Sequence, residues 1–154
     1  MSYINKEEFA EMVKTYQLEL YRLSFAILRN EADAQDAVGD AIVKAYEQRR
    51  MLCSKEKFES WIMKIVVNTS KNMLRSKHQI VYIEDMPEMK VGASEKRDEV
   101  WDAVLELDYK HRVVVVLYYY ECFSAKEISQ MLHIPEGTIK SRLARAREKL
   151  KTLL

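Results

Sequence analysis

Apolar residues recur at three- and four-residue steps along most of this chain, and this spacing restricts its fold more than any other feature. Such spacing lines one face of a helix. The first stripe comprises Phe9, Met12, Val13, Tyr16, Leu20, Leu23 and Ile27. It predicts a helix from about Asn5 to Leu28. Only three glycines and two prolines occur among 154 residues, which suits long helices better than a turn-rich sheet, so we expect an all-α protein.

The same period predicts two more helices before residue 76. Asn30 can cap the first of them, with Asp33 at the third helical position. Its inward face carries Ala34, Ala37, Val38, Ala41, Ile42 and Ala45. The charged segment 48–57 has no period and is expected to be mostly a loop. The stripe of the next helix comprises Phe58, Trp61, Ile62, Ile65, Val66, Thr69 and Met73.

The apolar period fails from Ser76 to Lys96, where Pro87 and Gly92 interrupt a segment of mixed charge. A segment of this kind is typical of a tether between domains. We therefore expect a three-helix domain over residues 1–76, a flexible linker over 77–96 and a four-helix domain over 97–154. A chain of this length can fill two small helical cores.

The run from Val113 to Tyr120 can be interpreted in two ways. Its β-branched and aromatic residues have high strand propensity. However, no second strand is predicted nearby to pair with it, and an unpaired strand leaves backbone groups unsatisfied. We therefore favour a helix for this run.

A helix-turn-helix is predicted near the C-terminus. Ser124 and Glu127 have the spacing of a capping box, so a short helix should begin near Ser124 and stop by Ile134. Pro135 disfavours helical geometry in the residue before it and suits the first turn of a new helix. Two helices separated by a tight turn, within about thirty residues, have helix-turn-helix spacing.

The second helix of this pair has a cationic and polar surface. The side chains on its exposed sides are Thr138, Lys140, Ser141, Arg142, Arg145 and Lys149. Arginine and lysine neutralise phosphates or contact guanine edges, and hydroxyl groups bond to phosphate oxygens. The pattern therefore favours binding of duplex DNA. The alternative is a solvated amphipathic helix that binds nothing.

Other classes of function find little support in the sequence. Cys53 and Cys122 are isolated, and the three histidines are scattered, so we expect no disulfide, metal site or cofactor. No motif supplies a nucleophile with its base, so an enzyme is not expected. There is no apolar run of about 18 residues and no leader at Met1, so we expect a cytoplasmic protein without a membrane span.

Three segments carry a resemblance to a known family. They are residues 30–38 (NEADAQDAV), residues 58–68 (FESWIMKIVVN) and residues 134–147 (IPEGTIKSRLARAR). The first two resemble region 2, and the third resembles the region 4 recognition helix, of the extracytoplasmic function (ECF) group of bacterial RNA polymerase sigma factors. The resemblance covers nearly the whole chain. It implies two helical domains that bind core RNA polymerase, at its β′ clamp helices and β flap, and promoter DNA.

The resemblance implies that the helix over residues 33–46 docks on the β′ clamp helices. An acidic stripe suited to a basic partner would consist of Asp33, Asp36, Asp40 and Glu47. A solvated helix face is the alternative for any one of them. Gly39 stands where the family usually has glutamine, and glycine weakens a helix interior, so altered affinity for core polymerase is expected.

By the same resemblance, the minus-10 promoter element would be handled by the third helix and the loop before Phe58. The side chains concerned are Asn68, Lys71, Asn72 and Arg75 on the helix and Arg49, Arg50 and Lys57 in the loop. Holding an opened strand requires stacking and hydrogen bonds to bases, and cations for the backbone. Phe58 and Trp61 lie at apolar positions of the helical pattern, so we expect core packing rather than base stacking from them.

The basic helix over residues 136–150 would read the minus-35 element, and an anti-sigma factor would be a further partner. Asp108 stands where the family commonly has proline, and Cys122 where it usually has glycine, so local differences are expected there. Two other functions stay open. One is a sigma-like mimic that sequesters an anti-sigma factor. The other is a dimeric helix-turn-helix regulator whose first 75 residues bind a ligand or form the dimer.

Overall fold

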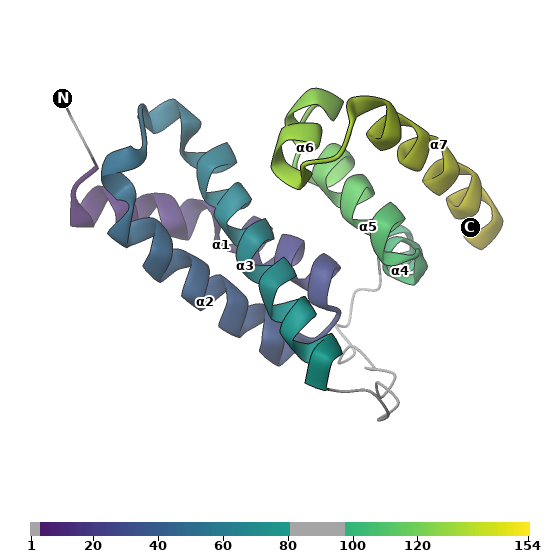
Figure 1. Ribbon diagram of the computed structural model, residues 1–154, viewed down its shortest axis with the longest axis horizontal. Coiled ribbons are helices and arrows are strands. Elements are labelled where there is room, and N and C mark those ends of the chain that lie inside the picture. The colour runs from purple at the N-terminus through teal and green to yellow at the C-terminus, as the bar shows by residue number, and fades with distance from the viewer. Residues whose placement is uncertain (1–3, 81–97) are drawn as a thin grey trace. The chain divides into compact units, whose positions relative to one another are not determined.

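The computed structural model describes residues 4–80 and 98–154. Within these residues the protein contains seven α-helices and no strand, so the expected all-α fold is confirmed. The chain divides into two compact units, Met1–Ile83 and Glu84–Leu154 (Figure 1). None of the helices in the described segments has the length and apolar character needed to cross a membrane.

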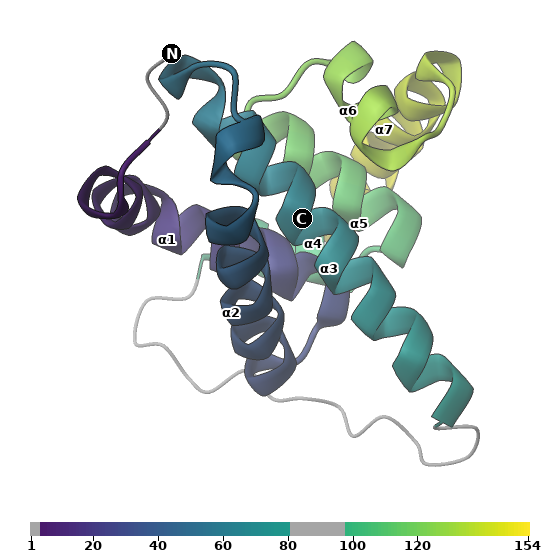
Figure 2. The ribbon, with the colours of Figure 1, turned by 60° about the vertical axis from the view of Figure 1, so that its left-hand side comes forward.

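The first unit is a bundle of three helices: α1 (Lys6–Leu28), α2 (Glu31–Glu47) and α3 (Phe58–Ile80). Each of the three packs against the other two, as Figure 2 shows for the purple, blue and teal ribbons. The side chain of Asn30 accepts a hydrogen bond from the backbone N–H of Asp33 at 2.9 Å. This is the predicted cap, and a cap of this kind stabilises a helix by about 1 kcal/mol.

The core of the first unit is filled by the apolar stripes. Phe9, Leu20, Leu23 and Ile27 of α1 are buried, and the four alanines at 34, 37, 41 and 45 in α2 are 0% exposed. Because alanine is short, its neighbours can approach the backbone of α2 closely. Phe58, at the start of α3, is 1% exposed, which confirms its expected place in the core.

α3 is longer than the sequence pattern indicated. The helix continues to Ile80, so residues 77–80 do not begin a linker as predicted. Lys77, in this extra turn, forms an ion pair with Asp33 of α2. An apolar period cannot reveal such a turn. Residues 81–96 of the predicted linker lie outside the described residues.

The segment between α2 and α3 contains two short 3-10 turns, η1 (Arg49–Met51) and η2 (Lys55–Lys57). Leu52 between them is buried, and Lys55 forms an ion pair with Glu8 of α1. The segment is thus a loop, as its missing period predicted, but it is attached to the bundle at two points.

The second unit contains α4 (Glu99–Glu106), α5 (Tyr109–Val115), α6 (Ala125–Leu132) and α7 (Glu136–Leu153). A π-helical turn, η3 (Val116–Tyr120), extends α5. The predicted helix from Val113 to Tyr120 is therefore confirmed, with a wider last turn than expected. Residues 113–117 are all buried, and α5 packs against α4 and α7. Burial of this apolar helix outweighs the strand propensity of its residues, because a helix satisfies its backbone hydrogen bonds internally.

The predicted helix-turn-helix is formed by α6 and α7. The capping box at Ser124 is present, with Glu127 N donating to Ser124 Oγ at 3.1 Å and Ser124 N donating to Glu127 Oε1 at 3.0 Å. His133 ends α6 in the left-handed region, with φ 57°. Pro135 lies one position earlier than expected, as the N-cap of α7 rather than within its first turn.

Candidate nucleic-acid interface

The surface of α7 separates into a buried stripe and a cationic one. Ile139, Leu143 and Ala146 are buried where α7 packs on the other helices of the second unit. Beside them runs a stripe with steps of four, three and four residues, consisting of Thr138, Arg142, Arg145 and Lys149. Because a helix advances about 1.5 Å per residue, this stripe is roughly 16 Å long. Thr138 and Arg142 are half-buried, and Arg145 and Lys149 are exposed.

Of the other two predicted residues of α7, Ser141 lies beside this stripe and Lys140 lies away from it. Lys140 is exposed and lies 3.5 Å from the carboxylate of Glu136, one turn earlier. Ser141 is exposed and donates its hydroxyl hydrogen to the backbone oxygen of Thr138 at 3.0 Å. Both are solvent-accessible. The 3.5 Å separation of Lys140 from Glu136 is longer than a charge-assisted hydrogen bond, so Lys140 can exchange this partner for another.

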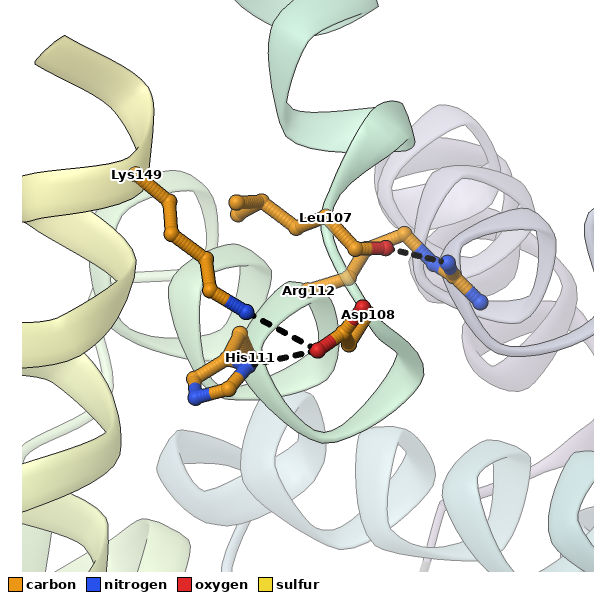
Figure 3. A network of polar contacts seen from close by, with 5 residues as sticks. All are labelled: Leu107, Asp108, His111, Arg112 and Lys149. Carbon is orange, nitrogen blue, oxygen red and sulfur yellow. Dashed lines mark hydrogen bonds and ion pairs between the residues drawn. The ribbon is translucent and has the colours of Figure 1, made fainter. Parts of the chain in front are cut away.

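Lys149 makes a polar contact that sequence reasoning missed. Its Nζ donates to Asp108 Oδ2 at 2.9 Å, and the same carboxylate lies 3.6 Å from Nδ1 of His111 (Figure 3). Close by, Arg112 donates from Nη1 to the backbone oxygen of Leu107 at 2.9 Å. Burial and the positive charge of Lys149 lower the pKa of His111 below its ordinary 6.5, despite the opposing charge of Asp108.

Arg147 also contacts a residue far away in sequence. It donates from Nη1 to the hydroxyl oxygen of Tyr119 at 2.9 Å, which links α7 to the π-helical turn. The ring of Tyr119 in turn lies edge-on to Tyr118, with centroids 4.9 Å apart. No local pattern could have indicated this contact, because the partners are 28 positions apart.

In the first unit, one face of α3 carries amides and cations. Asn68, Asn72 and Arg75 are exposed, and Lys71 is half-buried. Burial, followed by the nearby charge of Arg75, lowers the pKa of Lys71. Lys71 and Arg75 are four residues apart, so two like charges lie side by side on the helix. Such a pair is relieved when an anion, such as a phosphate, binds between them.

The loop cations differ from one another in their surroundings. Arg49 donates from Nη1 to the backbone oxygen of Tyr46 at 2.9 Å, and its guanidinium lies 4.2 Å from the centre of the Tyr46 ring. It therefore caps the C-terminus of α2, where a cation is favourable. Arg50 and Lys57 are exposed. Trp61 is half-buried, with its ring centre 6.0 Å from that of Phe58.

The four carboxylates of the predicted acidic stripe on α2 differ in their exposure to solvent. Asp36, Asp40 and Glu47 are exposed, whereas Asp33 is held by Lys77 and keeps only 15% of its side chain exposed. Gly39 lies in a groove of about 770 Å³ between α1 and α2, which Leu18, Val38 and Ile42 also line. A Cβ atom added at Gly39 would meet nothing within 4 Å, so the glycine opens the groove without being required by packing.

Comparison with known proteins identifies both units. Residues 12–80 match the model of sigma-70 region 2, and residues 97–150 match that of sigma-70 region 4. A sigma-E factor of Streptomyces antibioticus is 32% identical, covering 94% of this chain and 86% of its own. The ECF sigma factor SigM of Mycobacterium tuberculosis is 31% identical, and the match covers 95% of this chain and 76% of SigM. The ECF sigma factor SigW of Bacillus subtilis is 28% identical, and the match covers 97% of this chain and 90% of SigW.

Two solved structures share the fold. One is the sigma factor RpoE, crystallised with the anti-sigma factor NepR from Bartonella quintana, with a TM-score of 0.77, 21% identity and coverage of 96% of both chains. The other is CnrH, in complex with the cytosolic domain of CnrY, with a TM-score of 0.67, 21% identity and coverage of 97% and 88%. The two sigma-70 regions and the relatives over nearly the whole chain agree. The chain therefore belongs to the ECF sigma factors of the sigma-70 family, and it is a transcription initiation factor rather than an enzyme.

Proposed function

We propose that α7 reads the minus-35 element, that α3 and the loop before it hold the minus-10 element, and that α2 docks on core polymerase. The observation that carries the first assignment is the cationic stripe of α7, beside a buried apolar stripe and directly after a tight turn. A recognition helix held in this way presents its N-terminal residues to base edges in the major groove.

Within α7, we assign DNA contacts to Thr138, Lys140, Ser141, Arg142 and Arg145. Ser141 and Thr138 suit phosphate oxygens or bases, and Arg142 and Arg145 suit guanine edges or phosphates. Lys149 differs, because its ammonium group is bound to Asp108.

For the minus-10 element, we assign phosphate contacts to Lys71 and Arg75 and base contacts to Asn68 and Asn72. Lys71 and Arg75 lie one turn apart on the same face, and burial first, then the charge of Arg75, lowers the pKa of Lys71; a phosphate bound between them would relieve the repulsion. Arg50 and Lys57 would add cations from the loop. Arg49 has a smaller part in this proposal, because it caps α2.

For core polymerase, we assign the exposed carboxylates Asp36, Asp40 and Glu47, with the β′ clamp helices as their basic partner and the β flap as partner of the second unit. Asp33 contributes less, because Lys77 neutralises it. The chain would act in the cytoplasm, where core polymerase works. An anti-sigma factor is a further proposed partner, as NepR is for RpoE in the similar structure.

The test is initiation from a promoter library by the full chain mixed with bacterial core polymerase. Selective initiation that is lost on omitting the chain is expected. A mimic that only sequesters an anti-sigma factor would bind its partner without initiating transcription. Arg142→Ala should weaken promoter binding about tenfold or more, while Lys151→Met, on exposed α7 surface outside the assigned residues, should change it little.

A further inference from the structure

Asp108 occupies the N-cap of α5 but does not use its side chain as a cap. An aspartate at this position ordinarily accepts a hydrogen bond from the first backbone N–H groups of the helix. The Asp108 side chain makes no such bond. It accepts instead from Nζ of Lys149, 41 positions later in the sequence, and its carboxylate also faces His111 (Figure 3). The side chain therefore does not cap α5: it bonds to Lys149 of α7 and faces the side chain of His111 in the first turns of α5.

The backbone at this position does not require aspartate. Asp108 has φ −56° and ψ 151°, and the preceding Leu107 has φ −65° and ψ 154°. These values are those that a proline and its preceding residue adopt without strain. A residue with no polar side chain would thus fit the turn between α4 and α5. What aspartate adds is a carboxylate that bonds to Lys149 and lies 3.6 Å from Nδ1 of His111.

Lys149 would extend the cationic stripe of α7 if it were not held. It follows Arg142 by seven residues, so it lies on the same side of the helix and about 10 Å farther along it. A lysine at that position is suited to a phosphate of a DNA strand that Arg142 and Arg145 already contact. However, the ammonium group of Lys149 is hydrogen-bonded to the carboxylate of Asp108, and the negative charge of that carboxylate repels a phosphate.

We propose that Asp108 withholds Lys149 from DNA, so that the DNA-contacting part of α7 ends at Arg145. This inference rests on the proposed function of α7 as the minus-35 reader. Asp108 is a positioning residue in this scheme: it fastens the C-terminal half of α7 to the start of α5 and removes one phosphate contact. Fewer phosphate contacts lower the sequence-independent part of the affinity and leave base readout to the first turns of the helix.

The experiment uses full-length chain assembled with bacterial core polymerase. The probe is one promoter duplex, selected from a random library by the wild-type assembly. Affinity is measured over a series of salt concentrations for wild type, Asp108→Asn, Lys149→Met and the double variant. Wild type and Lys149→Met should have equal slopes of log affinity against log salt. Asp108→Asn should steepen the slope by about 0.9, the value for one added phosphate contact, and bind more tightly at low salt.

The double variant should return to the wild-type slope, because the added contact needs Lys149. Asp108→Pro, which suits the same backbone, should reproduce the effect of Asp108→Asn. Glu106→Gln removes another exposed carboxylate from the same unit and is the matched control for charge alone; its slope should stay within the error of wild type. Thermal unfolding of every variant reports on folding.

Two results would overturn the proposal. A shallower slope for Lys149→Met alone would mean that Lys149 contacts phosphate with Asp108 in place. An unchanged slope for Asp108→Asn would mean that the ion pair does not restrain Lys149. Failure of the proposed function looks different, because Arg142→Ala would then leave both affinity and slope unchanged.

Discussion

In the part of the chain that the structure describes, the residues that end helices in left-handed backbone geometry are not glycines. Among the described residues, Arg29, Cys122 and His133 have φ of 54°, 62° and 57°. Arg29 closes α1 and His133 closes α6, while Cys122 follows the π-helical turn η3. A side chain in this region crowds the backbone and costs about 1 kcal/mol or more, whereas glycine has no such cost. Each of these positions is therefore a place where stability can be gained.

Cys122 offers the clearest test, because it is exposed. Cys122→Gly should raise the free energy of unfolding of the second unit by about 1 kcal/mol, since relief of the left-handed strain outweighs the greater chain entropy of glycine. Chemical denaturation measures the change. Cys122→Ala is the control: it removes the thiol, keeps the Cβ atom and should give no gain. Equal stability of the two variants would rule out backbone strain as the cause.

His111 should make the stability of the second unit depend on pH. Burial lowers its pKa in the folded state below 6.5, and Lys149, Lys110 and Arg142 act in the same direction, while Asp108 opposes them. Between the lowered pKa and 6.5 the unfolded chain holds more protons than the folded one. Stability therefore falls as pH drops through 6.5, and the loss is complete below the folded pKa.

The measurement for His111 is the unfolding midpoint on both sides of pH 6.5. His111→Gln should flatten the decline on the acid side. His133→Asn is the control, because His133 is exposed at the end of α6 and asparagine tolerates its left-handed geometry. A decline that persists in His111→Gln would assign the pH dependence to other groups.

At the scale of elements, α2 has one weak point. Gly39 lies in the middle of the helix, and a Cβ atom there would meet nothing within 4 Å. Gly39→Ala should therefore raise the free energy of unfolding by about 0.5–1 kcal/mol, because alanine loses less backbone entropy. Thermal unfolding measures the gain. Gly137→Ala, near the N-terminus of α7 and also in open space, should gain less, because helix ends fray.

The same α2 variant bears on polymerase docking. Gly39→Ala should leave affinity for core polymerase near the wild-type value, since a methyl group fills little of the 770 Å³ groove. Gly39→Gln projects a longer side chain over the groove and should change that affinity. Pull-down titration with core polymerase compares the two. If neither variant differs from wild type, the partner does not contact the groove at this position.

For the whole molecule, the proposed division of labour predicts effects at separate steps of initiation. Arg142→Ala should weaken the first, closed promoter complex by about tenfold or more, because α7 is proposed to contact duplex DNA. Lys71→Met should leave closed-complex affinity nearly unchanged and lower the yield of open complex, because its proposed partner is the opened strand. Gel retardation and permanganate footprinting distinguish the two steps. Identical defects in both variants would contradict separate roles for the two units.

Much of the fold could be predicted from the sequence, because helical periodicity is local. The bounds of α1, the cap at Asn30 and the capping box at Ser124 all follow from residues within a few positions of one another. The helix at Val113–Tyr120 required a less local argument, namely that no partner strand was predicted. The last turn of α3 was missed, because Lys77 is held by a charge on another helix.

The sequence by itself determined which side chains could serve DNA or polymerase, since charge, amide content and helical spacing can be read along the chain. Only the tertiary structure decided which of them are already engaged. Asp33 is bound by Lys77, 44 positions away, and Lys149 by Asp108, 41 positions away. Ion pairs of this kind arise where helices pack side by side, and the distance along the chain carries no information about that approach. A charged residue that the sequence offers as a contact for DNA or polymerase can therefore be one that the fold already holds in an intramolecular ion pair.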